Sequence, residues 1–269
     1  MPSPGFRVVT KQAICQWHVL CYKAFEGAAP SEGRVLRRFG PFGAVSGLSR
    51  KRPMPTTLTL STKNYSSWSL RGWLMAKLAG VEFEEVIVAP SDSDARAEIL
   101  LLSPSILVPC LTYQGMRVWD TLAIGEFLNE IAPNAGLLPR DQAERAHCRS
   151  ICGEMHSGFT SLRQALPMNI KSQFPGFKIW SKARADIDRI LFIWRECLET
   201  YGGPFLFGDI CMADAMYAPV VSRFRTYGVT LEGPLKTYAD RIWDLPAMVE
   251  WREAALAERE EIEELEVEF

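Results

Sequence analysis

Apolar residues in 54–138 recur with the periods of short strands and of helices that bury one face. Polar and apolar residues alternate over Thr57–Leu60, which predicts a strand, and Phe83–Val88 predicts a second one. Two more strands are expected on either side of a turn at Gln114-Gly115. Helical spacing or composition predicts helices over Trp68–Ala79, Asp94–Leu102 and Thr121–Ile131.

These elements follow one another as strand, helix, strand, helix, two strands and helix, the order of a thioredoxin-like α/β domain. Residues 140–269 carry only helical patterns, separated by glycine and proline. Five helices are predicted there: Gln142–Leu166, Phe177–Tyr201, Met212–Thr226, Leu235–Trp243 and Ala247–Glu260. The sequence therefore predicts a thioredoxin-like domain over 54–138, followed by an all-α domain over 140–269.

The composition is that of a soluble globular protein. Of the 269 residues, 48% are hydrophobic and 23% are charged, which is enough apolar side chain for a substantial core. The apolar runs are short, whereas a membrane-spanning helix needs about 20 apolar residues, so no membrane partner is predicted. Seven dispersed cysteines favour reduced thiols and a cytoplasmic location.

Residues 1–53 differ from the remainder in charge and pattern. They are basic, rich in glycine, proline, serine and arginine, and lack a sustained helical or alternating period, so we expect a disordered extension. Three interpretations remain open: a dispensable or wrongly assigned leader, an organelle-targeting peptide, or a tail that binds nucleic acid. The first is favoured, and no nucleic-acid partner is predicted.

Three motifs in 54–138 resemble known proteins by their order and spacing. They are Asn64–Arg71, the stretch from Ser103-Pro104-Ser105 to Leu111, and Trp119–Ile124. Together they resemble the amino-terminal half of the glutathione transferases, and in particular the serine-type, bacterial-like enzymes nearest to the zeta kind. The resemblance implies a glutathione transferase-like two-domain architecture, glutathione as co-substrate and a homodimer.

The resemblance also implies how glutathione is held. Pro109 would follow a cis peptide bond, Val108 would present backbone groups to the cysteinyl part, and Asp120 with Thr121 would bind the γ-glutamyl end. Asp120-Thr121 has a simpler interpretation, a cap on the following helix. Many relatives carry glycine and a basic residue where this chain has Ile106-Leu107, which predicts weak glutathione binding unless a base such as Arg71 compensates.

The chemistry requires a thiolate, because a thiol with a pKa near 8.5 is only about 3% ionised at pH 7. A hydroxyl at a helix start can donate a hydrogen bond to the sulfur, and the resemblance aligns Ser66 with this role. Ser67 and Tyr65 are the alternatives, and Ser66 might otherwise only cap the helix. Trp68 replaces a cysteine of zeta enzymes, which argues against a disulfide mechanism and weakens an isomerase assignment.

The helical domain is expected to shape the pocket of a small hydrophobic electrophile. Met155, Phe159 and Arg163 are candidates to line that pocket, and ordinary packing between the domains is the alternative. Cys148, Cys152 and His156 share one helix face, where core or pocket wall is favoured over a metal site, so no metal is predicted.

Two further features of the helical domain have structural interpretations. Cys211 and Asp214 occupy the positions of a helix-capping motif, which makes Asp214 structural and not catalytic. Glu258–Glu268 reads as a solvated acidic tail.

The leading hypothesis from the sequence is a glutathione transferase that directs the thiolate at an electrophile, with a role in detoxification. A glutathione-dependent isomerase or dehalogenase would use the same thiolate. A non-catalytic interaction module of the same fold is the third hypothesis, favoured by Ile106-Leu107 and by Cys211.

Overall fold

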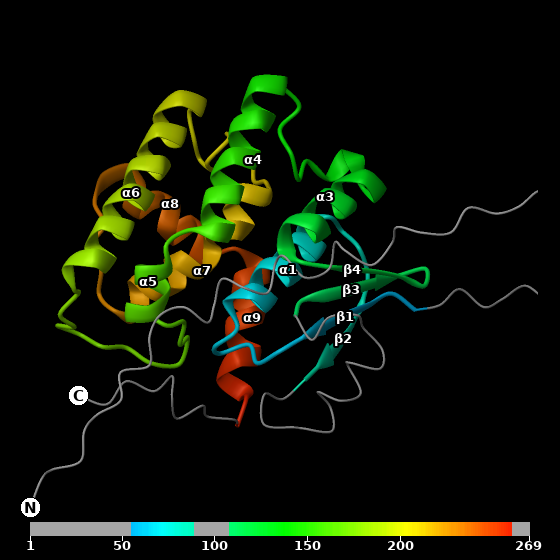
Figure 1. Cartoon of the computed structure of the whole chain (residues 1–269), viewed down its shortest axis with the longest axis horizontal. Coiled ribbons are helices and arrows are strands. Elements are labelled where there is room, and N and C mark those ends of the chain that lie inside the picture. Colours follow the sequence, from blue (N-terminus) through cyan, green and yellow to red (C-terminus); the bar gives the residue numbers. More distant parts are fainter. Residues whose placement is uncertain (1–54, 89–107, 260–269) are drawn as a thin grey trace, which may run out of the picture. The chain divides into compact units, whose positions relative to one another are not determined.

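The computed structural model describes residues 55–88 and 108–259 of the chain (Figure 1). The predictions made for 1–53, for the helix over Asp94–Leu102 and for Ile106-Leu107 lie outside the described residues. None of the described helices is long and apolar enough to cross a membrane.

A four-stranded sheet forms the first half of the fold, in the order β2-β1-β3-β4. The strands are β1 (Thr57–Leu60), β2 (Glu84–Ile87), β3 (Cys110–Tyr113) and β4 (Met116–Trp119). β1 and β2 are parallel, because helix α1 (Ser67–Leu78) crosses between them, whereas β3 is antiparallel to both β1 and β4. Gln114 and Gly115 both have positive φ, as the tight β3–β4 turn requires.

The predicted elements of this half that fall within the described residues are confirmed within a residue or two. Leu58 and Leu60 are fully buried while Thr57 and Thr59, which alternate with them, are less so, as the alternation predicts. Helix α3 (Thr121–Ile131) has the predicted bounds, and α1 starts and ends one residue earlier than predicted. α1 packs against α3 on one side and against helices of the second half on the other (Figure 1).

The second half of the described chain is helical, as predicted. After a short 3₁₀ turn (Pro133–Ala135) come α4 (Gln142–Ser157), α5 (Thr160–Ala165), α6 (Ser181–Tyr201), α7 (Met212–Thr226), α8 (Gly233–Trp243) and α9 (Pro246–Ala257). Nearly every residue of α7 is buried, and this helix contacts α1, α4 and α8. The thioredoxin-like and helical parts therefore share a core along α1 and α7.

Several predicted helix boundaries differ from the structure: α8 begins at Gly233, two residues before its predicted start, and α9 ends at Ala257, before the predicted Glu260. The two largest differences lie in α4 and α6. The single helix expected over Gln142–Leu166 is two helices, because α4 ends at Ser157, with Gly158 as its C-cap, and Phe159 adopts a left-handed backbone with φ of 58°. A Cβ at position 158 would lie 2.7 Å from the Glu154 carbonyl oxygen, so glycine is required at this break. α6 begins four residues after Phe177, whose ring instead packs on Tyr227 at 4.9 Å between centroids.

Candidate functional site

Ser66 caps the amino terminus of α1, the helix start that the sequence singled out. Its Oγ accepts a hydrogen bond from the Ser69 backbone N–H at 3.3 Å and donates to Ser69 Oγ at 2.8 Å. Ser69 Oγ also accepts from the Ser61 N–H at 2.9 Å, so Ser69 remains bonded if Ser66 turns its proton elsewhere. Ser66 therefore caps the helix, as one of the two interpretations of the sequence predicted. Its hydroxyl proton can also turn to a ligand without leaving Ser69 Oγ unbonded.

Burial separates Ser66 from its two alternatives. Ser66 is half-buried, whereas Ser67 and Tyr65 are 6% and 7% exposed. Ser67 Oγ accepts a hydrogen bond from Arg223 Nη2 at 3.4 Å. Of the three hydroxyls, Ser66 is therefore the most accessible to a ligand.

Three arginines surround the first turn of α1, and we call Arg71, Arg163 and Arg223 the guanidinium cluster. The guanidinium carbons of Arg71 and Arg163 each lie 4.7 Å from the centre of the Trp68 ring, and Arg223 reaches the neighbouring Ser67. Arg71 also donates to the Ser67 carbonyl at 3.4 Å and, across the domain interface, to the Met216 carbonyl at 2.8 Å. Trp68 is half-buried, so the cluster borders solvent at this ring.

The pKa values of all three arginines are lowered. Burial, followed by the charges of Arg163 and Arg223, holds the pKa of Arg71 well below its usual value. Burial and the charge of Arg163 lower the pKa of Arg223 to about 10, and burial alone lowers that of Arg163. In each of the three arginines burial disfavours the charged guanidinium, and in Arg71 and Arg223 the charges of neighbouring arginines add to this effect.

Val108 and Pro109 lie directly before β3, as the sequence predicted, and Pro109 lies beside Gly72 of α1. The Val108-Pro109 peptide bond is cis, which confirms that expectation. Pro109 is buried against α1, and a Cβ at Gly72 would lie only 2.5 Å from Pro109 Cγ. Gly72 is thus what allows α1 to approach this proline.

Asp120 and Thr121 begin α3. Asp120 has a positive φ of 75°, and its Oδ1 accepts from the Leu122 and Ala123 backbone N–H groups, so the helix cap is present. Its other oxygen lies 2.6 Å from His156 Nε2, and the His156 ring meets Trp68 edge-on at 5.2 Å. Thr121 Oγ1 is buried and has no hydrogen-bond partner in the described part of the chain.

The three residues expected to line the electrophile pocket separate into two kinds. Met155 and Phe159 are 1% and 7% exposed and belong to the hydrophobic core. Arg163 is half-buried and is held by the carbonyls of Met155, His156 and Gly158 at the end of α4. Trp68 and Arg163 are thus better placed than Met155 and Phe159 to touch a ligand.

The cysteine-rich face of α4 lies in the core. Cys148 and Cys152 are fully buried, and Cys211 at the start of α7 is 2% exposed. A hydrogen bond with the Cys152 thiol, followed by burial, raises the pKa of Cys148 far above its usual value, although the Cys211 thiol opposes the shift, and this makes Cys148 unreactive. Within 55–88 and 108–259 no group of His, Cys, Asp and Glu is arranged to hold a metal ion.

The loop before Ser66 is fastened by residues distant in sequence. Asn64 is fully buried, and its Oδ1 accepts from the Ile170 and Lys171 backbone N–H groups at 2.7 and 3.0 Å. The Glu258 carboxylate accepts from the Lys63 N–H at 2.6 Å and the Asn64 N–H at 3.0 Å. The prediction of a solvated tail is therefore wrong at Glu258, because this side chain satisfies loop donors; the residues after Arg259 lie outside the described chain.

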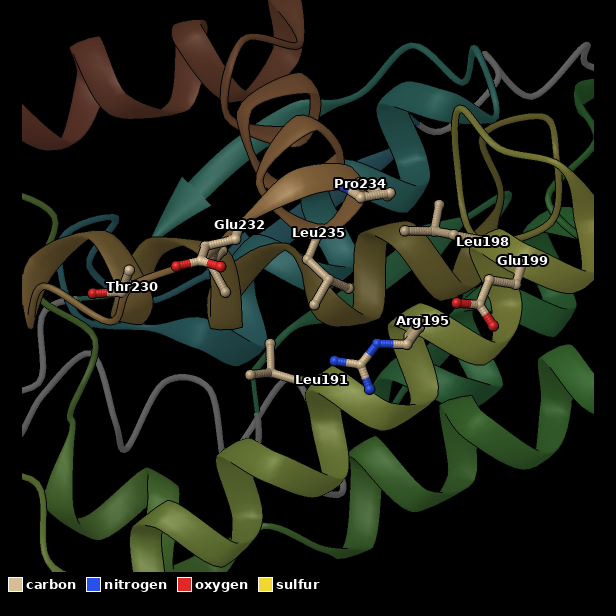
Figure 2. Close-up of a pocket in the computed structure, with 9 residues that line it drawn as sticks. Leu191, Arg195, Leu198, Glu199, Thr230, Glu232, Pro234 and Leu235 are labelled. Carbon is tan, nitrogen blue, oxygen red and sulfur yellow. The ribbon is translucent and has the colours of Figure 1, made fainter.

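A separate pocket lies in the helical half. It has a volume of about 360 Å³ and is lined by Leu191, Arg195 and Leu198 of α6 and by Pro234 and Leu235 of α8, among others (Figure 2). None of the residues predicted for glutathione or for the electrophile lines it.

The sequence reasoning missed Arg223, the His156–Asp120 contact and Glu258. Arg223 had a weak signal, since a charged residue stands between the apolar Val221 and Phe224 in the last turn of the predicted helix Met212–Thr226. Such a charge is costly without a partner and indicates a special environment. The contacts of His156 and Glu258 had no comparable signal, because each joins residues far apart in the chain.

Comparison with known proteins finds a family match in the first half of the fold. A family model described as "Glutathione S-transferase, N-terminal domain" matches residues 65–131, the segment from the helix start to the end of α3. A probable maleylacetoacetate isomerase of Caenorhabditis elegans is 25% identical over 68% of this chain and 86% of its own length. A maleylacetoacetate isomerase of Rattus norvegicus is 28% identical over 61% of this chain and 76% of its own length.

Residues 65–131 match the amino-terminal domain of the glutathione S-transferases, and the chain is similar over more of its length to curated relatives of that family. Solved structures of glutathione S-transferase fold confirm the architecture. A Burkholderia glutathione transferase homologue with bound glutathione has a TM-score of 0.58 at 22% identity, and covers 75% of this chain and 98% of its own. The predicted two-part glutathione S-transferase fold is confirmed.

Proposed function

We propose that this glutathione S-transferase activates the glutathione thiol as a thiolate at the start of α1 and directs it at a small electrophile. The observation that carries the proposal is the half-buried hydroxyl of Ser66 at a helix amino terminus that three arginines surround. A serine-type mechanism fits, because Trp68 stands where a thiol-based mechanism would need cysteine.

The electrostatics of the site favour an anion at sulfur. Lowering a thiol pKa by roughly 2 units needs about 2.7 kcal/mol. A hydrogen bond from Ser66, the positive end of α1 and the nearby guanidinium charges each contribute in the same direction. Ser66 can supply its proton by turning away from Ser69 Oγ, because Ser69 keeps the Ser61 N–H as a donor.

The remaining roles follow the family's pattern. Val108, before the cis Pro109, would offer backbone groups to the cysteinyl part of glutathione, and Asp120 and Thr121 would bind the γ-glutamyl end. Thr121 Oγ1 is buried and has no partner among the described residues, which supports this role, since a polar ligand atom would satisfy it. His156 would hold Asp120 in position.

The second substrate would lie against Trp68 and Arg163, with Met155 and Phe159 forming the apolar floor beneath them. Several relatives are named maleylacetoacetate isomerases, and an isomerase would use the same thiolate but release glutathione unchanged. Product analysis separates the two outcomes, since conjugation consumes glutathione and isomerisation does not. A cytoplasmic homodimer without a bound metal is the form in which we expect the enzyme to act.

The test compares the full chain with Ser66→Ala and with Ser157→Ala, a control at an exposed serine of α4. Glutathione at about 100 times its dissociation constant should stabilise all three by about 2.7 kcal/mol, seen as a raised melting temperature. Conjugation to a chromogenic aryl halide should fall about 10- to 100-fold in Ser66→Ala only. Absence of a glutathione effect at about ten millimolar would instead favour a non-catalytic interaction module.

A further inference from the structure

An exposed tryptophan with basic neighbours lies where the loop after α5 meets α6. Trp180, the N-cap residue of α6, is 76% exposed, which is the highest value for any large hydrophobic side chain in the described part of the chain. Lys178, Lys182 and Arg184 are also exposed, and all three lie within four residues of Trp180. We call these four residues the Trp180 patch.

The positive charge of the patch is not balanced by the described residues around it. None of Lys178, Lys182 and Arg184 forms an ion pair with a described carboxylate. The next acidic residue along the chain, Asp186, instead accepts a hydrogen bond from the Leu162 N–H at 2.8 Å. Cations at the amino-terminal end of a helix also oppose its dipole. The patch is therefore unfavourable for α6 unless an anion offsets its charge.

The ring and the cations together define what the patch binds. An indole offers a broad apolar face and one N–H donor, and tryptophan is enriched where two surfaces meet. Lysine and arginine side chains pair with carboxylates. A matching occupant therefore carries several carboxylates with apolar side chains between them.

The end of the described chain lies beside the loop that leads to the patch. Lys171 Nζ in this loop donates a hydrogen bond to the Glu258 carbonyl oxygen at 2.5 Å. Phe174 and Phe177 both pack on Tyr227 at the end of α7, with 5.3 and 4.9 Å between ring centroids. These contacts fold the loop against the helix, and the residue after Phe177 is the first of the patch.

Residues 260–269 have the composition that the patch requires. Six of the ten are glutamate, and each of the other four is an apolar residue that follows a glutamate: Ile262, Leu265, Val267 and Phe269. Ten extended residues span about 33 to 36 Å, whereas the seven residues from Lys171 to Lys178 span at most about 25 Å. The segment is therefore long enough to reach from the contact at Glu258 to the patch.

We propose that residues 260–269 bind the Trp180 patch of the same chain, with their carboxylates on the three cations and an apolar side chain on the indole. Single ion pairs at a surface are weak, but here several act together and the segment is tethered at Glu258. A short tether gives an effective concentration on the order of millimolar, which favours this occupant over a free acidic protein or a second copy. The inference goes beyond the proposed function, because no residue of the patch is assigned to glutathione or to the electrophile.

The bound segment acts on the loop before Ser66 through Glu258. The Glu258 carboxylate accepts hydrogen bonds from the Lys63 and Asn64 N–H groups, while its carbonyl oxygen accepts from Lys171. Because the segment continues directly from these contacts, its binding holds Glu258 in place. Replacing the six glutamates of 260–269 by glutamine should therefore lower the melting temperature, by about 2 to 4 °C.

Zero-length cross-linking of the full chain tests the contact. A water-soluble carbodiimide joins a lysine amine to a carboxylate only where the two touch, and mass spectrometry then identifies the linked residues. Lys178 or Lys182 should be joined to a glutamate of 260–269. Lys236 is the control, because its Nζ lies 2.5 Å from Asp240 Oδ2, and it should be joined to Asp240 and not to 260–269. An equal mixture of unlabelled and isotope-labelled chains shows whether a link lies within one chain.

Charge variants test the specificity of the contact. Arg184→Glu, which leaves both lysines of the patch in place, should lower the yield of links to 260–269 about tenfold and leave the link from Lys236 unchanged. Raising the salt concentration to about 1 M, or replacing the six glutamates by glutamine, should each about double the acrylamide quenching of Trp180, because either change weakens the ion pairs. The Trp180 signal is the difference from Trp180→Phe. Glu196→Gln, at an exposed position of α6, should leave the quenching unchanged.

Three outcomes would overturn the proposal. Links between copies, with none within a chain, make a second copy the occupant. Links from 260–269 to Lys236 as often as to the patch, or no links at all, show that the segment has no fixed site there. Sedimentation of the wild type with phosphatidylserine vesicles, lost in Trp180→Ala, makes an anionic membrane the occupant. None of these outcomes bears on the glutathione reaction, which the comparison of Ser66→Ala with the wild type tests separately.

Discussion

Cys211 occupies a position at which serine or threonine usually starts a helix. Asp214 accepts a hydrogen bond from the Cys211 N–H at 2.8 Å, and the two side chains form a capping box, with sulfur as the weaker acceptor. Cys211→Ser should therefore increase the free energy of unfolding by about 0.5 to 1 kcal/mol, measured by denaturant titration.

Cys197→Ser is the matched control for this prediction. Cys197 is fully buried inside α6, where a hydroxyl gains no capping role, so this change should destabilise the protein. Equal effects of the two substitutions would show that Cys211 acts only as a core residue.

Asp214 makes stability depend on pH. Burial raises its pKa from 3.8 to about 6, while its bonds from Cys211 and Leu206 oppose the shift. Because the folded state holds the proton more tightly, this contribution to stability is complete below about pH 4 and is lost as pH rises through 6. The difference in free energy of unfolding between wild type and Asp214→Asn should fall by roughly 2 to 3 kcal/mol from pH 4 to 7.

Chemical denaturation at several pH values measures this difference. A difference that stays constant, or that grows as pH rises, would show that Asp214 is ionised throughout and that its bonds outweigh burial.

For single residues, the sequence predicted which residues lie at the site better than it predicted which residues they contact. Ser66, Pro109 and Asp120 stand out through local signals, a helix start or a proline before a strand, and the structure places each at that local feature. Arg223 and Glu258 act through contacts that span more than a hundred residues, to Ser67 and to Lys63. Local periodicity carries no information on such contacts, so they required the fold.

Among the elements, α1 depends on one glycine. The added Cβ of Gly72→Ala would lie 2.5 and 2.8 Å from Pro109 Cγ and Cβ, so either α1 or the β3 entry has to move. We expect a loss of about 1 to 3 kcal/mol of stability and weaker glutathione binding, because Val108 moves with Pro109. Thermal unfolding with and without glutathione measures both effects.

Gly153 in α4 provides the control, since a Cβ there has no atom within 4 Å. Gly153→Ala should stabilise the protein by about 0.5 to 1 kcal/mol through helix propensity alone. Similar changes at both glycines would contradict the close approach of α1 to Pro109.

The helices predicted best were those with a strong hydrophobic period and clear helix-ending residues. α3 and α7 have the predicted bounds because apolar spacing and a capping residue agree at each start, and Pro133 and Gly228 follow the respective ends. The break between α4 and α5 was missed because Gly158-Phe159 interrupts an otherwise continuous helical pattern, and a lone glycine is tolerated inside many helices.

At the scale of the whole molecule, Glu258 joins the end of α9 to the loop before Ser66. Glu258→Gln keeps one acceptor oxygen and removes the charge, so the bonds from the Lys63 and Asn64 N–H groups should weaken. We expect a loss of about 1 to 2 kcal/mol in stability. Glu253→Gln, at an exposed position of α9, should have almost no effect, and equal melting temperatures of both variants would contradict the role of Glu258.

The ties at Asn64 have a consequence for how the protein opens. Asn64 Oδ1 holds the N–H groups of Ile170 and Lys171, while Glu258 holds those of Lys63 and Asn64. None of these four amides is bonded within a helix or strand, yet releasing any one of them loosens the others. In native-state hydrogen exchange they should therefore exchange as one cooperative unit, with the slow rates of buried secondary structure and not the fast rates of a surface loop.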